Sequence, residues 1–79
     1  MKVEVKDDYI LQILKKEQKD FTELAEGVAH LILEEYNRGG IKGYFGILKK
    51  VKYELQDKIE KMIEKKEISM VDGFYKSLK

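Results

Sequence analysis

Cysteine, proline and tryptophan are all absent from this sequence of 79 residues. The absence of cysteine excludes disulfides, thiolate metal sites and thiol catalysis. The absence of proline leaves glycine as the residue that interrupts helices, and Gly39, Gly40, Gly43 and Gly46 lie within eight positions. This glycine cluster divides the chain into two halves.

A long apolar run and an excess of one charge are also missing. No stretch approaches the ~18–20 apolar residues that cross a membrane, and the first six residues lack the apolar core of a signal peptide. We therefore expect a cytoplasmic protein without a membrane partner.

The two halves of the chain differ in charge. Residues 1–40 carry 6 basic and 9 acidic side chains, net −3, whereas residues 41–79 carry 10 basic and 6 acidic side chains, net +4. A chain this short is only marginally stable alone, which leaves a homodimer open.

The apolar periodicity predicts an all-α fold. We expect a single helical domain over residues 1–79, built as a small bundle of three to four helices with a short extended arm at its N-terminus. The expected helices span about 8–18, 20–37, 43–65 and 70–78. Valines alternate with charged residues over 2–6, but no partner strand is evident, so whether this arm forms a strand stays open.

Local signals set these boundaries. Asp20 and Glu23 have the spacing of a capping box, and the Gly39-Gly40 pair ends the second helix. The third helix is the clearest, because six of its apolar residues fall within about 80° of arc: Tyr44, Leu48, Val51, Leu55, Ile59 and Met62. Its other side offers two ion pairs one turn apart, Glu54 with Lys58 and Asp57 with Lys61.

Groups that could perform catalysis are scarce. His30 is the only histidine, with Glu26 and Glu34 one turn away on the same helical face. We interpret it as a surface histidine, because dimetal bundles need E-x-x-H motifs from separate helices. The glycine cluster matches neither the P-loop nor the dinucleotide-binding spacing. We predict no catalytic residue, no metal ligand and no cofactor, so the protein is not expected to be an enzyme.

The segment 36–53 is the most informative part of the chain. No acidic residue occurs in the eighteen positions between Glu35 and Glu54. Tyr53 falls opposite the apolar stripe, so we expect it to be exposed. We predict that this segment binds a partner through basic and aromatic side chains: Arg38, Lys42, Tyr44, Phe45, Lys49, Lys50, Lys52 and Tyr53.

Such a surface suits an acidic protein surface, where tyrosine and arginine are favoured anchors. It also suits a nucleic acid, through phosphate contacts and base stacking, and a merely solvated basic face is the simplest alternative. We expect a non-enzymatic regulatory module that binds and modulates, for example inhibits, a larger intracellular protein. Its size and composition are typical of small accessory proteins of phages and mobile elements. Non-specific nucleic-acid binding ranks second, because a pI near 7.9 is below the ~9 expected for such domains.

Overall fold

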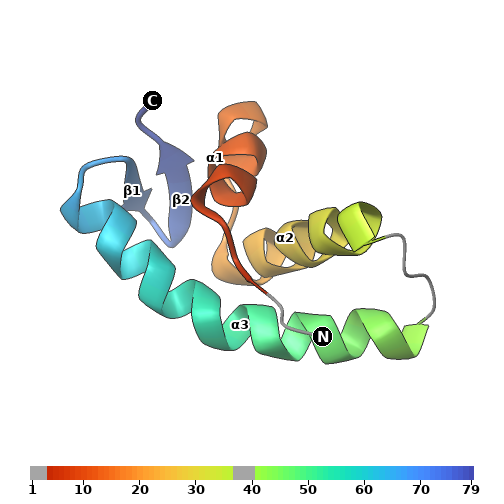
Figure 1. Ribbon diagram of the computed structural model, residues 1–79. Helices are drawn as coiled ribbons and strands as arrows, with labels where there is room; N and C mark the ends of the chain where they lie inside the picture. Colours follow the sequence, from red (N-terminus) through yellow and green to blue (C-terminus); the bar gives the residue numbers. More distant parts are fainter. Residues whose placement is uncertain (1–3, 37–40) are drawn as a thin grey trace.

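A computed structural model describes residues 4–36 and 41–79 of the chain. Three helices, α1 (Asp7–Lys16), α2 (Phe21–Tyr36) and α3 (Ile41–Glu64), are followed by two strands, β1 (Ile68–Val71) and β2 (Phe74–Ser77). Figure 1 shows α3 along one side of the molecule, with α2 beside its first half and the strands near its end. At a rise of about 1.5 Å per residue, the 24 residues of α3 extend about 36 Å.

The prediction of an all-α bundle is wrong at the C-terminus. Residues 68–77 form an antiparallel hairpin instead of the helix predicted over 70–78, so the fold combines three helices with a two-stranded sheet. Asp72 and Gly73 form the turn, with φ values of 52° and 81°. Positive φ at both central residues is the geometry of a type I′ turn, for which Asp-Gly is a preferred sequence. The same two φ values are incompatible with a right-handed helix.

The end of α3 directs the chain into this hairpin. Lys66 has a φ of 60°, the Glu67 amide donates to the Met62 carbonyl at 2.9 Å, and the Lys66 amide donates to the Ile63 carbonyl at 3.0 Å. These two bonds define a Schellman motif, with lysine at the left-handed position that glycine usually occupies. The motif satisfies two carbonyls at the helix end and turns the backbone toward β1.

The linker between α1 and α2 pairs with the outer edge of β2. The Lys19 amide donates to the Tyr75 carbonyl at 3.2 Å, and the Tyr75 amide donates to the Lys19 carbonyl at 2.7 Å. The next residues form the predicted capping box: the Glu23 amide donates to Asp20 Oδ1 at 2.8 Å, and the Asp20 amide donates to Glu23 Oε1 at 3.3 Å. The start of α2 is therefore fixed by reciprocal bonds that the sequence predicted.

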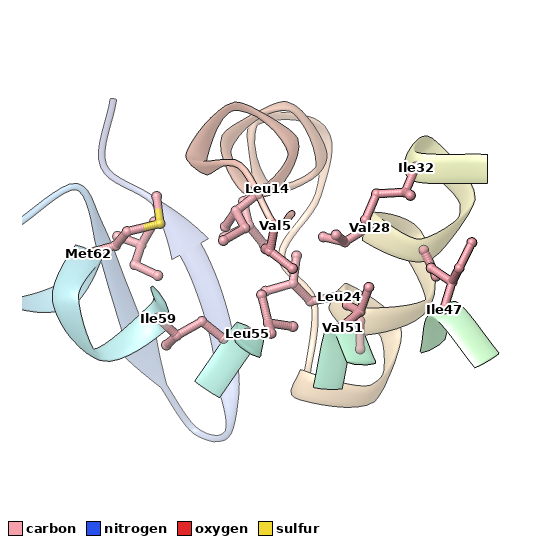
Figure 2. Packing of buried hydrophobic residues seen from close by; sticks show 14 residues of the cluster. Val5, Leu14, Leu24, Val28, Ile32, Ile47, Val51, Leu55, Ile59 and Met62 are labelled. Atoms are coloured by element: carbon pink, nitrogen blue, oxygen red, sulfur yellow. The ribbon is translucent and has the colours of Figure 1, made fainter. Parts of the chain in front are cut away.

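One apolar core joins all the elements. Four residues of the predicted stripe on α3 are buried, while Tyr44 and Leu48, which begin the stripe, are half-buried. Val5 is 1% exposed and belongs to the same cluster, and Figure 2 shows its side chain among those of the helices. The arm at residues 4–6 is thus anchored by one valine, although these residues form no strand. Core residues labelled in Figure 2 include Leu14, Leu24, Val28, Ile32, Val51, Leu55, Ile59 and Met62.

Helices α1 and α2 approach closely at Gly27. A Cβ atom at this position would lie 2.9 Å from Cδ1 of Ile13, which is closer than real Cβ atoms approach their neighbours. The absence of a side chain in the middle of α2 therefore lets α1 lie against it.

We predict that Gly73→Ala destabilises the protein by about 1–2 kcal/mol, because an L-residue with a side chain is disfavoured at positive φ. The free energy of unfolding from denaturant titration measures the effect. Asp72→Asn is the matched control: asparagine tolerates the same conformation, so its stability should equal or exceed that of the parent. Equal stability of Gly73→Ala and the parent would contradict the hairpin turn.

Candidate functional site

The two sides of α3 have opposite surroundings. Its inner side is buried against the other elements, and Figure 1 shows those elements together on that side. We call the opposite side the outer face and define it by seven exposed residues: Gly46, Lys49, Lys50, Tyr53, Gln56, Asp57 and Glu60. Tyr53 lies at the middle of this face and is 87% exposed. It is an aromatic side chain presented to solvent by a helix whose other side is held rigidly in the core.

The structure brings together five of the eight predicted binding residues. Lys49, Lys50 and Tyr53 lie on the outer face, while Lys52 and Phe45 are exposed at one of its margins. Arg38 lies outside the described residues, and so does the side chain of Lys42. Tyr44 is separate from this group, because it is half-buried against the core.

Tyr44 packs toward α2 instead of toward solvent. Its ring centroid lies 4.9 Å from that of His30 and 5.6 Å from that of Phe45. Burial, with a further contribution from the charge of Glu26, raises the pKa of the Tyr44 hydroxyl above its ordinary value. The phenol therefore stays neutral at physiological pH, and Tyr44 joins α3 to α2.

His30 is exposed, and its ring lies against Tyr44. Within residues 4–36 and 41–79, no three histidine, cysteine or acidic side chains are arranged to hold a metal ion. The spacing of Glu26, His30 and Glu34 on one helical face thus produces no such cluster in the described structure.

The lysines of α3 differ from one another in their ionic contacts. Lys58 pairs with Asp7 of α1 at 3.1 Å, instead of with Glu54 as the sequence predicted, whereas the predicted pair between Lys61 and Asp57 is present at 3.5 Å. Among the residues that the structure describes, Lys49, Lys50 and Lys52 form no ion pair. Three positive charges therefore lie beside Tyr53 without an anionic partner in residues 4–36 and 41–79.

Charge changes sign along α3 at Tyr53. Residues 41–52 contain four lysines and no acidic residue, net +4, whereas residues 53–64 contain four acidic residues and two lysines, net −2. A shallow hollow lies on each side of Tyr53. Besides Tyr53 and Glu54, which line both, one hollow is lined by Gly46, Lys49 and Lys50. The other is lined by Gln56, Asp57, Lys58, Glu60 and Lys61.

The acidic half of this face was not among the binding residues predicted from sequence. The signal was present, because Gly46, Lys50, Tyr53, Asp57 and Glu60 follow one another at intervals of four, three, four and three. That spacing describes a continuous seam along one helix. This seam does not resemble a usual helix interface, because it contains one aromatic residue and no aliphatic residue.

Gly43 and Gly46 of α3 lie in open space. A Cβ atom at either position would meet no atom within 4 Å in the described structure.

A second set of exposed apolar residues lies in and after the hairpin: Met70, Val71, Phe74 and Leu78. Apart from Met70, these residues were expected to form the apolar side of a fourth helix.

We predict that Gly46→Ala raises the free energy of unfolding by about 1 kcal/mol, because alanine has the higher helix propensity and the site is open. Denaturant titration is again the measurement. Gly27→Ala is the comparison, and its gain should be smaller or reversed because its Cβ meets Ile13 at 2.9 Å. A loss of stability in Gly46→Ala would show that the outer face is covered in the folded protein.

None of the helices in the described part of the chain is both long and apolar enough to cross a membrane. Comparison with protein-family models, with curated proteins and with solved structures finds no match for this chain. Its function is therefore inferred from its own residues.

Proposed function

We propose that this chain is a non-enzymatic, cytoplasmic interaction module that binds a larger protein through the outer face of α3 and thereby modulates it. The partner surface is acidic where it meets Lys49, Lys50 and Lys52. Tyr53 is the central contact, with the lysines around it as a polar rim. This arrangement follows the usual anatomy of protein interfaces, in which a few aromatic anchors contribute most of the affinity.

One observation carries the proposal: an 87% exposed tyrosine lies beside three lysines that have no ionic partner among the described residues. A solvated helix face does not require a large aromatic side chain at its centre. A docking face benefits from one, because tyrosine adds a large contact area while losing little conformational entropy on binding. The core beneath α3 holds the helix in place, so little further ordering opposes binding.

The chemistry of the chain supports a role without catalysis. It has no cysteine, one histidine, and only Thr22, Ser69 and Ser77 as aliphatic hydroxyls. The histidine ring lies against Tyr44, and the two serines belong to the strands of the hairpin.

Nucleic-acid binding is the weaker candidate on this geometry. A phosphate backbone that followed the outer face past Tyr53 would meet Asp57 and Glu60 within two turns. Phosphate contacts dominate nucleic-acid affinity, so these carboxylates oppose an extended track. A protein surface can instead match a face that changes sign along its length.

The test uses a soluble Glu-rich helical peptide as the probe, titrated into isotopically labelled protein and followed by nuclear magnetic resonance. We predict that amide shifts change on the outer face. The variant Lys49→Glu/Tyr53→Ala should keep its fold, because both side chains are exposed, and should bind about tenfold more weakly through loss of the anchor and one charge. Lys76→Glu, an exposed lysine on β2, is the control and should retain the affinity of the parent.

Retention of full peptide affinity in the double variant would contradict the proposal. So would tighter binding of a random-sequence DNA duplex than of the peptide, with an affinity that falls steeply as salt is raised. The steep salt dependence identifies counterion release from a phosphate backbone.

A further inference from the structure

The basic and acidic halves of the outer face of α3 are complementary in charge. Lys49 and Lys50 lie four and three residues before Tyr53, and Gln56 and Asp57 lie three and four residues after it. The sequence around Tyr53 thus places positive charge on one side and negative or neutral groups at the same distances on the other.

Two copies of α3 related by a two-fold axis can pair their opposite charges. When two copies of α3 lie antiparallel with Tyr53 opposite Tyr53, residues before Tyr53 in one copy face residues after it in the other. Lys49 and Lys50 then face Asp57 and Gln56 of the second copy, and the same contacts repeat across the axis. A parallel arrangement would instead place lysine beside lysine and carboxylate beside carboxylate. The charges therefore favour the antiparallel arrangement alone.

We propose that the outer face of α3 binds a second copy of this chain, in an antiparallel pair centred on Tyr53. This inference rests on the proposed function, because it assigns a further occupant, a second copy of the chain, to the same docking face. The acidic surface that the lysines need is supplied by Asp57 and Glu60 of the second copy.

The shape of the face agrees with this occupant. Tyr53 stands between the two shallow hollows, so the tyrosine of one copy can rest beside that of the other with offset rings. Gly46 lies seven residues before Tyr53 and Glu60 seven after it. Because Gly46 has open space around it, the longer glutamate side chain has room at that position.

The pair also regulates the docking face. Both faces are covered in the antiparallel pair, so a larger acidic partner and the second copy compete for the same lysines. The interface is one helix face with a single aromatic residue, which corresponds to a weak, transient class of contact. Raising the concentration of the chain therefore lowers the amount of free docking face.

The test is charge reversal with mixing, followed by sedimentation velocity over a range of concentrations. Lys49→Glu/Lys50→Glu makes the whole face acidic, and Asp57→Lys/Glu60→Lys makes it basic. Each variant alone should self-associate about tenfold more weakly than the parent, because symmetric attractions become repulsions. The two variants mixed in equal amounts should associate at least as tightly as the parent. Tyr53→Ala should weaken the parent pair, and Lys15→Glu/Lys16→Glu, on the exposed end of α1, should not.

The outcomes separate this inference from the proposed function. A parent that remains monomeric at high concentration but binds the Glu-rich peptide overturns the second-copy inference and leaves the docking face standing. Self-association that is unchanged by both charge-reversal variants also overturns it, because the contact then lies elsewhere. A parent that neither self-associates nor binds the peptide overturns both.

Discussion

The structure depends on burial of one stripe along α3. Val51, Leu55, Ile59 and Met62 are almost fully removed from solvent, and each such side chain stabilises the fold by roughly 1.5–3 kcal/mol. Helix α2 covers the first part of this stripe, and the hairpin lies near its end, where Met62 is buried together with Ile68. Every other element of the described chain lies on that side of α3, so about 36 Å of helix keeps its opposite side free. The exposure of the outer face is thus a consequence of how the core is built.

The helices could be predicted because their signals are local and agree with one another. The apolar spacing of α3 and the reciprocal capping of Asp20 and Glu23 each specify one structure. The hairpin was missed because its apolar residues imitate a helix: Val71, Phe74, Tyr75 and Leu78 recur at intervals of three, one and three. The Asp-Gly pair at its centre is the stronger signal, because it requires a backbone conformation that a helix excludes. Pairing of β2 with Lys19 is a contact across 56 positions of sequence, which no local pattern reveals.

Part of the candidate site could likewise be predicted from local sequence, and part could not. Exposure of Tyr53 followed from its place opposite the stripe, and helical periodicity was sufficient to predict it. Tyr44 belongs to the apolar stripe that the sequence predicted, and its ring lies against His30 of α2, apart from the exposed residues around Tyr53. The acidic half of the outer face can be recognised only when the whole of α3 is considered. Lys49 and Asp57 are then equidistant in sequence from Tyr53, and Lys58 forms an ion pair with Asp7 of α1.

The central claim is that the exposed side of α3 is a contact surface that a second copy can occupy. The most direct measurement is a concentration series of amide spectra of the parent protein alone at low salt. The account predicts progressive shifts confined to the outer face between Gly46 and Glu60, with the buried stripe and the hairpin unchanged. Shifts confined to residues 68–77, or spectra that do not change with concentration, would contradict it.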